Sequence, residues 1–487
     1  MARWRVADAA AAVGGRVRGD AGAAFAGAAI DSRAVAGGVL FVAFAGSRTD
    51  GHRFVADAFA RGAAAALVDA SVETSETLAL PEPAAAGRAL IAVPDTFRAL
   101  HDLARATRAR LPRKLVGITG SAGKTTTKEL LADMLAARFR TARTKGNFNN
   151  LYGLPLTLLN VPEATEWLVA ELGMSTPGEL RQLSLLARPD VALFTVVRPA
   201  HLEFFGSVRA IAEAKAELLA GLAPDGLVVA NADDPEVARI AREHAASGGR
   251  RVVWYGIEGH HAAPDVRATD VGPSAPVGSR FRLTAGGESV EVALPLHGLY
   301  NVENCLAAAA CAWALGVPLA AIAAAAAAAR PASKRGVVHR LAGGITLIDD
   351  SYNSNPDALA RALESAALLP AARRWAVLGD MRELGPEGPR FHREAGERAA
   401  AAGFSPVAGV GELARELARG AGERGAGSSW LPDAAAAADW AAAELRDGDL
   451  VLVKGSRGVG LEAVVERLLA SRAAAASGAD SSVEAAS

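Results

Sequence analysis

A glycine-rich turn between an apolar run and a helix-like segment constrains this chain more than any other feature. Residues 115–118, Leu-Val-Gly-Ile, predict a short buried strand, and residues 128–138 have the apolar spacing of a helix. Between them lies Thr119-Gly-Ser-Ala-Gly-Lys-Thr125. A strand, a glycine turn and a helix N-terminus direct several backbone N–H groups to one point, which suits a phosphate. The stretch therefore predicts a phosphate-binding loop.

Two side chains of this turn favour a nucleoside triphosphate bound with a metal. Lys124 can reach the outer phosphates, and the Thr125 hydroxyl can bind Mg²⁺. The usual phosphate-loop pattern has a glycine five residues before Gly123, where this chain has Ile118, so the loop is a variant form. The alternative is a chance Gly-Lys-Thr in an ordinary strand-to-helix turn, which the flanking strand and helix patterns disfavour.

Length and composition set the broad class of the protein. A chain of 487 residues is too long for one core and suggests about three domains. The net charge of −1 gives no reason to expect binding to nucleic acid or to a membrane surface. We expect no membrane span, because every apolar run of about twenty residues contains glycine or charge. Residues 1–15 lack the apolar core of a signal peptide, so we expect a cytoplasmic protein.

The two cysteines point to the same compartment. Cys305 and Cys311 lie six residues apart in an alanine-rich helical stretch. This spacing suits neither a zinc site nor a disulfide framework. We therefore expect two buried thiols in a reducing compartment.

Strand and helix patterns alternate along most of the chain and predict an α/β protein of three domains. We expect an N-terminal domain over residues 1–94, a central domain over 95–330 and a Rossmann-like C-terminal domain over 331–472. The central domain should contain a mostly parallel sheet that carries the phosphate loop. Residues 265–296 change to two-residue alternation, which predicts an antiparallel flap. The small, polar residues 473–487 are expected to be disordered.

Apolar runs in each domain predict the individual strands. The N-terminal domain should have strands at 39–44 and 64–69 around a helix at 54–61, and a linking helix should follow at 95–110. Strands in the central and C-terminal domains are predicted at 115–118, 167–170, 191–197, 227–229, 252–254, 345–348, 375–378, 407–410 and 450–453.

Charged residues after these strands are candidates for catalysis. Glu171 closes the strand at 167–170, on the side of a parallel sheet where ligands bind, within plausible reach of a metal held by Thr125. His201 and Lys215 follow the next strand and are candidates for the same metal site. Taken alone, a core histidine and a helix-surface lysine are the more ordinary interpretations of these two residues.

In their order along the chain, these runs resemble those of the Mur ligases, the ATP-dependent amide-forming enzymes of peptidoglycan synthesis. The resemblance extends over nearly the whole chain, and the variant turn is that family's own form of the phosphate loop. The branch that adds D-alanyl-D-alanine is the most similar, because the run Asp349-Asp-Ser-Tyr-Asn-Ser-Asn-Pro356 is specific to it. Gly146-Asn-Phe-Asn-Asn150 and Lys454-Gly-Ser-Arg457 also agree with that branch.

The resemblance implies the ligands of each domain: a UDP-sugar for the first, ATP for the second and the incoming dipeptide for the third. The substrates would be ATP, UDP-N-acetylmuramoyl-tripeptide and D-alanyl-D-alanine, and we expect a monomer. The nucleotide-binding positions are Thr119, Gly120, Ser121, Ala122, Gly123, Lys124, Thr125, Asn301, Asn304, Arg335 and Asp350. The substrate-binding positions are Ser32, Arg33, Asn149, Asn150, Tyr352, Asn355, Lys454, Ser456 and Arg457. Arg335 is preferred to Arg340 because of its fifteen-residue spacing to Asp350.

The resemblance also implies the metal chemistry. Lys124, His201 and Lys215 would be catalytic, and Mg²⁺ would be held by Thr125, Glu171, His201 and Lys215. Lys215 would be carbamylated by CO₂, since a carbamate offers an anionic oxygen to Mg²⁺ and an ammonium does not. The alternative is an ammonium that pairs with Glu171 or a phosphate.

Two positions depart from the family pattern. Val196 and Arg198 stand where relatives usually carry an asparagine and a glycine. Contacts that relatives make through those two side chains are therefore not carried over to this chain.

Three other functions are compatible with parts of the sequence. A sister ligase that adds another amino acid is disfavoured by the run 349–356. A folate or poly-amino-acid ligase would share the central domain but would have no use for residues 1–94. A regulatory or motor ATPase would hydrolyse ATP without an amine acceptor, and it leaves the run 454–457 unexplained.

Overall fold

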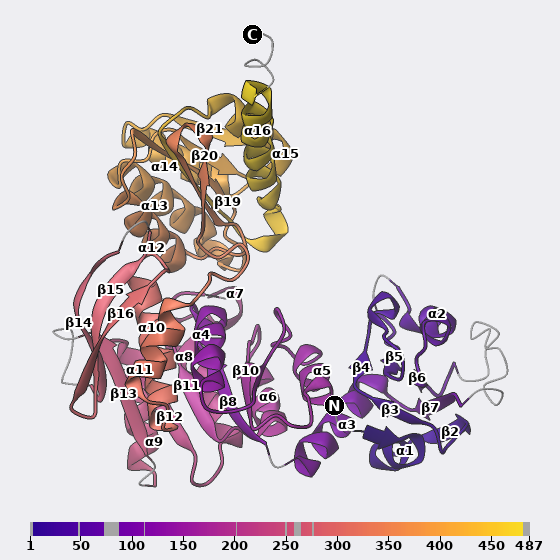
Figure 1. The fold of residues 1–487 in the computed structure, drawn as a ribbon. Coiled ribbons are helices and arrows are strands. Elements are labelled where there is room, and N and C mark those ends of the chain that lie inside the picture. Colours follow the sequence, from indigo (N-terminus) through magenta and orange to yellow (C-terminus); the bar gives the residue numbers. More distant parts are fainter. Residues whose placement is uncertain are drawn as a thin grey trace.

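Three α/β domains follow one another along the chain, as the sequence predicts (Figure 1). The computed structural model describes residues 3–46, 49–72, 87–111, 113–200, 202–248, 251–257, 264–274 and 277–480. None of the helices in these ranges combines the length and apolar character needed to cross a membrane.

The N-terminal domain is built on a five-stranded sheet of order β2-β7-β6-β5-β4, with a separate antiparallel pair β1–β3. The predicted strands and helix near residues 40, 65 and 55 are confirmed as β5, β6 and α2. The elements are β1 (Arg3–Arg5), α1 (Val6–Val13), β2 (Arg16–Gly19), β3 (Ala24–Ala26), β4 (Ala28–Ala29), η1 (Ser32–Ala34), β5 (Leu40–Val42), η2 (Gly51–Phe54), α2 (Val55–Ala60), β6 (Ala65–Asp69) and β7 (Ala89–Val93).

Helix α3 (Thr96–Arg110) connects this domain to the central sheet and confirms the predicted linking helix. Asp95 caps its start by accepting hydrogen bonds from the Phe97 and Arg98 N–H groups at 2.8 and 3.0 Å. Leu100 and Leu103 on its apolar face are buried in the core of the N-terminal domain. The helix packs against both domains, because α5 (Gly153–Asn160) of the central domain contributes Leu156 and Leu159 to the same cluster.

The central domain has a nine-stranded sheet of order β16-β15-β14-β13-β12-β11-β8-β10-β9. Pairing is parallel from β9 through β14 and antiparallel among β14, β15 and β16, which confirms the predicted flap. The strands are β8 (Lys114–Thr119), β9 (Thr141–Arg143), β10 (Trp167–Glu171), β11 (Val191–Phe194), β12 (Leu227–Asn231), β13 (Val252–Ile257), β14 (Val266–Pro273), β15 (Ser279–Ala285) and β16 (Glu288–Leu294).

Helices cover both faces of this sheet. One face packs against α5 (Gly153–Asn160), α6 (Glu179–Ala187), α8 (Val208–Ala216) and α9 (Pro235–Ala246), with α7 (Leu202–Phe205) and η4 (Glu217–Gly221) between them in the chain. The other face packs against α4 (Lys124–Ala136), α10 (Leu299–Ala314) and α11 (Leu319–Ala327).

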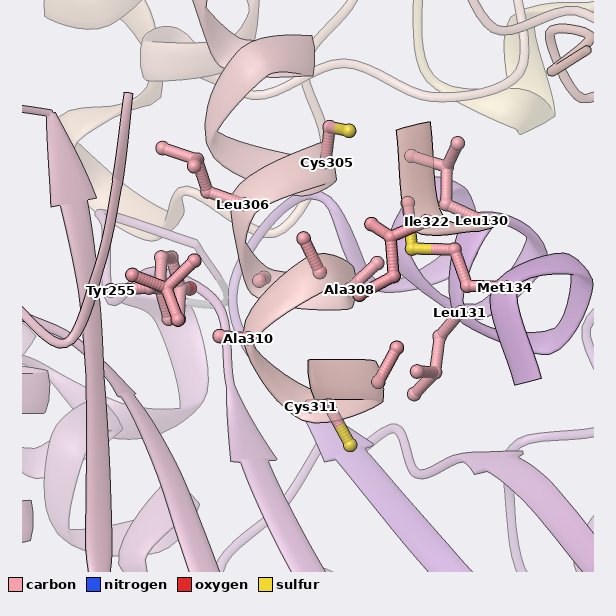
Figure 2. Packing of buried hydrophobic residues seen from close by; sticks show 14 of the residues in the cluster. Leu130, Leu131, Met134, Tyr255, Cys305, Leu306, Ala308, Ala310, Cys311 and Ile322 are labelled. Atoms are coloured by element: carbon pink, nitrogen blue, oxygen red, sulfur yellow. The ribbon is translucent and has the colours of Figure 1, made fainter. Parts of the chain in front are cut away.

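The small side chains of α10 allow this helix to lie deep in the core. Figure 2 shows α10 with Leu131 and Met134 of α4 on one side and Tyr255 of β13 on the other. Cys305 and Cys311 are buried in this cluster as free thiols, as predicted. Burial raises the pKa of the Cys305 thiol to about 12, so it stays protonated and unreactive at neutral pH.

The C-terminal domain has a six-stranded sheet of order β17-β18-β22-β19-β20-β21, parallel except for β17. Helices α12, α13 and α14 cover one face, and α15 and α16 cover the other. The elements are β17 (Val337–Leu341), η5 (Ala342–Gly344), β18 (Ile345–Asp350), α12 (Pro356–Ala367), β19 (Arg373–Gly379), η6 (Gly385–Glu387), α13 (Gly388–Ala401), β20 (Val407–Val410), α14 (Ala414–Glu423), β21 (Ser428–Leu431), α15 (Ala434–Glu444), β22 (Asp449–Lys454), η7 (Arg457–Val459) and α16 (Glu462–Asp480).

The end of the chain differs from the expected disordered tail at 473–487. Helix α16 continues to Asp480, because the alanines at 473–476 have the highest helix propensity of any residue. Residues 481–487 lie outside the described part of the chain.

Candidate active site

The predicted phosphate loop joins β8, an interior strand of the central sheet, to α4. Gly123 has a φ of 83°, a left-handed conformation that favours glycine, and an added Cβ would lie 2.1 Å from the Asn304 side-chain oxygen. A Cβ on Gly120 would lie 1.8 Å from Thr195 Oγ1. The loop therefore needs both glycines in order to pack between the end of β11 and α10.

Residues after β11 hold the loop in place. The predicted strand at 191–197 ends at Phe194, because the next residues pair with the loop. Thr195 Oγ1 donates to the Ala122 carbonyl at 2.7 Å, and the Val196 carbonyl accepts from Ser121 N at 2.7 Å. Val196, one of the two positions expected to depart from the family pattern, thus makes a polar contact through its backbone.

Lys124 lies across the loop, with its Nζ donating to the Gly120 carbonyl at 2.7 Å. Burial lowers the pKa of this ammonium, and the nearby Glu171 carboxylate opposes that shift. A cation held at the mouth of a glycine turn and helix N-terminus can neutralise charge on a bound phosphate chain.

A carboxylate connects the phosphate loop to the 146–150 loop. Glu171, at the end of β10, is 2% exposed. Its Oε2 accepts from the Thr125 hydroxyl at 2.8 Å, and its Oε1 accepts from Asn149 Nδ2 at 2.7 Å. Glu171 therefore directly contacts Thr125, the residue that is expected to hold the metal. The pair offers oxygen ligands of the kind that Mg²⁺ prefers.

Replacing Glu171 with glutamine tests this metal assignment. The amide keeps the size of the side chain but removes the negative charge, so the Mg²⁺ concentration for half-maximal rate should rise about tenfold or more. Rates measured over a Mg²⁺ titration would check this. Glu243→Ala, at an exposed position on α9, serves as the matched control. An unchanged Mg²⁺ dependence would exclude Glu171 as a ligand.

Lys215 is enclosed in the same part of the domain. It lies in the last turn of α8 and is 2% exposed. Burial, together with the positive charge of Lys124, lowers the pKa of Lys215 well below its usual value, which favours the neutral amine. His201, the other predicted metal ligand, lies outside the described residues. Among the described residues, no three His, Cys, Asp or Glu side chains gather as a metal cluster.

Predicted nucleotide residues from four segments line one small pocket of about 140 Å³. Asn304 Nδ2 donates to Asn301 Oδ1 at 3.3 Å, and Asn301 Nδ2 donates to the His297 carbonyl at 2.8 Å. The members of the pocket that the sequence predicted are Ser121, Ala122, Gly123, Asn301, Asn304, Arg335, Asp350, Tyr352, Asn355 and Lys454. Arg340 instead lies on β17, where it donates to Thr346.

A larger hollow of about 690 Å³ opens beside the phosphate loop, between the central and C-terminal domains. Thr125 lines it from the central domain, and Tyr352 and Arg457 line it from the C-terminal domain. The Arg335 guanidinium lies 3.9 Å from the centre of the Tyr352 ring, and that of Arg457 lies 5.8 Å from it. Arg335 and Arg457 are therefore two of the five basic residues that line this hollow next to the predicted site of phosphate transfer.

Lys454 has partners within the chain that the sequence did not predict. Its Nζ donates to Asp350 Oδ2 at 2.6 Å and to the Asn353 carbonyl at 2.9 Å. The lysine predicted to contact the dipeptide thus orients the aspartate predicted to contact the nucleoside. Only the fold brings these two residues together, because β18 and β22 are neighbours in the sheet.

Several other predicted residues have local structural contacts. Asn150 Oδ1 accepts from Gly153 N at 2.9 Å at the start of α5, and Asn355 caps α12 by accepting from Ala358 N at 2.8 Å. Ser456 Oγ accepts from Arg382 N at 3.1 Å. These side chains shape the loops that surround the site.

Ser32 and Arg33 lie apart from the phosphate loop, in η1 of the N-terminal domain. Ser32 is buried, whereas Arg33 is 82% exposed at its side chain and pairs with Asp31 at 2.8 Å. This ion pair and the accompanying hydrogen bonds lower the pKa of Asp31. The exposed guanidinium is accessible to a ligand.

The sequence did not predict a chain of ion pairs that joins the central and C-terminal domains. Arg198 Nη1 pairs with the buried Asp234 at 2.5 Å, and its Nε lies 3.4 Å from Asp357 of α12. Asp357 also pairs with Arg361 at 3.2 Å, and Arg361 pairs with Glu303 of α10 at 2.7 Å. Arg198, which departs from the family pattern, therefore joins the phosphate loop region to α12.

Comparison with known proteins gives a consistent result for all three domains. Residues 25–108 match the description Mur ligase family, catalytic domain; residues 118–312 match Mur ligase middle domain; residues 334–457 match Mur ligase, glutamate ligase domain.

Individual relatives are similar over nearly their whole length. The UDP-N-acetylmuramoyl-tripeptide–D-alanyl-D-alanine ligase of Bacillus subtilis (strain 168) is 36% identical over 451 residues, which covers 91% of this chain and 93% of the relative. The crystal structure of MurF from Acinetobacter baumannii has a TM-score of 0.82 at 30% identity and covers 96% of this chain and 99% of its own. MurF ligase from Thermotoga maritima in complex with ADP has a TM-score of 0.74 at 29% identity, covering 91% and 97%.

Proposed function

Because this chain belongs to the Mur ligase family, we propose that it joins D-alanyl-D-alanine to UDP-N-acetylmuramoyl-tripeptide, converting ATP to ADP and phosphate. The product is the UDP-muramoyl-pentapeptide precursor of peptidoglycan. The N-terminal domain (1–94) would bind the UDP-sugar, the central domain (95–330) ATP, and the C-terminal domain (331–472) the dipeptide. We also propose a cytoplasmic monomer.

The hollow beside the phosphate loop is the observation that best supports this reaction. Thr125 lies on its central-domain side, and Tyr352 and Arg457 lie on its C-terminal side. A ligase must bring an activated carboxylate and an amine together next to the phosphates. A hollow of about 690 Å³ is large enough to hold the reacting ends of two peptide substrates.

The first step is attack of the tripeptide's terminal carboxylate on the γ-phosphate of ATP, which forms an acyl phosphate and releases ADP. Lys124, held across the glycine turn, stabilises the negative charge on the transferring phosphoryl group. Asn301, Asn304, Arg335 and Asp350 would hold the adenosine.

The second step is attack of the dipeptide amine on the activated carbonyl, after which phosphate leaves and the amine proton passes to solvent or a nearby base. Arg457 would bind the dipeptide carboxylate, and Tyr352 and Ser456 would position the chain. Lys454 would act mainly through Asp350, with which it pairs. Ser32 and Arg33 would bind the UDP end, and Asn149 and Asn150 the sugar-peptide.

The residues present fit a requirement for Mg²⁺, since a buried carboxylate and a threonine hydroxyl meet at the phosphate loop. Bound there, Mg²⁺ would neutralise charge on the phosphates and orient them. Thr125 and Glu171 would hold it, with His201 and a carbamate on Lys215 as ligands of a second ion.

Phosphate release with defined substrates tests the function. The enzyme should release phosphate with ATP, Mg²⁺ and UDP-muramoyl-tripeptide only when D-alanyl-D-alanine is present. Single amino acids offered as acceptors test for a sister ligase. Steady ATP hydrolysis without any acceptor would support a regulatory ATPase and contradict the proposal.

Replacing Arg457 with alanine tests how the dipeptide is recognised. Loss of a charge-assisted contact to a carboxylate should raise the dipeptide KM about ten- to a hundredfold and leave the KM for ATP nearly unchanged. Arg424→Ala, at an exposed position after α14, is the matched control in the same domain. If the dipeptide KM stays the same, Arg457 does not bind the substrate.

A further inference from the structure

A second hollow, lined by basic side chains, lies at the start of β8. The phosphate loop follows the other end of the same strand. The hollow has a volume of about 760 Å³ and contains four basic side chains, those of Arg113, Lys114, Arg138 and Arg140. Lys114 begins β8, and Thr119 ends that strand just before the loop. A strand of this length spans about 20 Å, so the hollow is separate from the site of phosphate transfer.

Arg113 is the unusual residue in this hollow. Its side chain is 5% exposed, and Nε, Nη1 and Nη2 have no hydrogen-bond partner among the described residues. Burying a guanidinium with all of its nitrogens unpaired is costly, because the group loses its hydration and gains nothing in exchange. Such a side chain indicates a ligand that supplies the missing acceptors.

Two of the other three cations around the hollow already have hydrogen-bond partners in the protein. Arg138 donates to the Gly316 carbonyl after α10, and Arg140 Nε donates to the Ala164 carbonyl at 2.7 Å. Arg138 thus has a structural role, because it donates to a carbonyl group just after the end of α10. Lys114 is exposed, with its ammonium 5.6 Å from the centre of the Trp167 ring. Arg113 and Lys114 therefore remain as the two donors available to a ligand.

The charges that line the hollow favour an anion. The four basic side chains face two carboxylates, Glu163 and Glu166, which leaves a net charge of +2. Glu166 is occupied, because its Oε2 accepts from Arg140 N at 2.9 Å. Glu163 attracts Arg113 electrostatically but makes no hydrogen bond with it in the described structure.

We propose that this hollow binds a small oxyanion, a phosphate or carboxylate group of a metabolite, through the Arg113 guanidinium with Lys114 beside it. The planar guanidinium presents paired N–H donors whose spacing matches the two oxygens of such a group. The site is distinct from the nucleotide and substrate positions of the ligase reaction.

Anion titrations of the full-length protein test this site. Every sample carries Lys124→Ala, which weakens anion binding at the phosphate loop. Thermal unfolding is followed over a titration of inorganic phosphate, and in a second series of succinate, at constant ionic strength. We expect the midpoint to rise with at least one of them, and the anion that binds more tightly identifies the preferred group. Adding Arg113→Gln should raise the apparent Kd at least about tenfold.

Two further variants keep the test decisive. Glu163→Gln removes a competing carboxylate and should lower the apparent Kd severalfold. Lys114→Gln, at an exposed position, should weaken binding severalfold even if Arg113→Gln fails to fold. Identical titrations with and without these substitutions would overturn the proposal. The proposal would also be overturned if the Glu163→Gln protein had a lower unfolding midpoint and responded to neither anion. Arg113 would then serve only to pair with Glu163.

Discussion

Replacing Lys124 with alanine should lower kcat by at least about a thousandfold, because no other side chain of the loop can neutralise the phosphates. The Lys124 Nζ contacts the Gly120 carbonyl at the mouth of the turn. A second buried lysine on which the charge of Lys124 acts, Lys215, would be a metal ligand and is held in α8. Single-turnover formation of acyl phosphate, measured by rapid quench, would show whether the first chemical step is the one affected.

Two controls separate this effect from misfolding. Lys124→Arg keeps the positive charge with a different shape and should retain more activity than the alanine variant. Binding of UDP-muramoyl-tripeptide should be nearly unchanged in both variants, because its proposed residues lie on other loops. If the alanine variant released phosphate at the normal rate, the assignment of the central site would be wrong.

The fold of the central and C-terminal domains could be predicted because their buried parallel strands are apolar runs with glycine or charge at the end. The strands near 115, 167, 227 and 450 show this pattern and were found. Strands β1, β2, β3, β4, β7, β9, β17 and β21 were missed. Strand β4 is only Ala28–Ala29, a sequence with no strand preference, and it forms because β5 provides a pairing edge.

The candidate site likewise contains contacts that the sequence predicts and contacts that it does not. Glu171 was predicted beside Thr125, because strand ends in a parallel sheet share one edge and the order of strands brings them together. The pairing of Lys454 with Asp350, and that of Arg198 with Asp357, join residues more than a hundred positions apart. Such pairs depend on the order of strands and on how two domains meet, which no local pattern encodes.

Lys215→Ala should lose most of its activity and regain part of it with added short-chain carboxylates. The proposal is that the neutral amine reacts with CO₂ to form a carbamate and release a proton, giving an anionic ligand for Mg²⁺. Burial and the charge of Lys124 both lower the pKa of Lys215, which favours the reactive neutral amine. Acetate or formate can occupy the space left by the missing carbamate and supply its oxygen.

Lys124→Ala is the matched control, because it removes a lysine from the same site whose role is that of a cation. An added carboxylate should therefore restore the activity of the Lys215→Ala enzyme but not that of the Lys124→Ala enzyme. Rescue of both variants would point to a general salt effect, and rescue of neither would favour an ammonium at Lys215.

A direct measurement of the carbamate is independent of turnover. Enzyme equilibrated with ¹³C-bicarbonate should show a carbamate carbon signal that is absent from Lys215→Ala. Removing CO₂ from the wild-type enzyme should lower its activity, and bicarbonate should restore it, with a larger loss at lower pH because protonated amine does not react with CO₂. An enzyme that keeps full activity without CO₂ and shows no carbamate signal would leave Lys215 as an ammonium that pairs with Glu171 or with a phosphate.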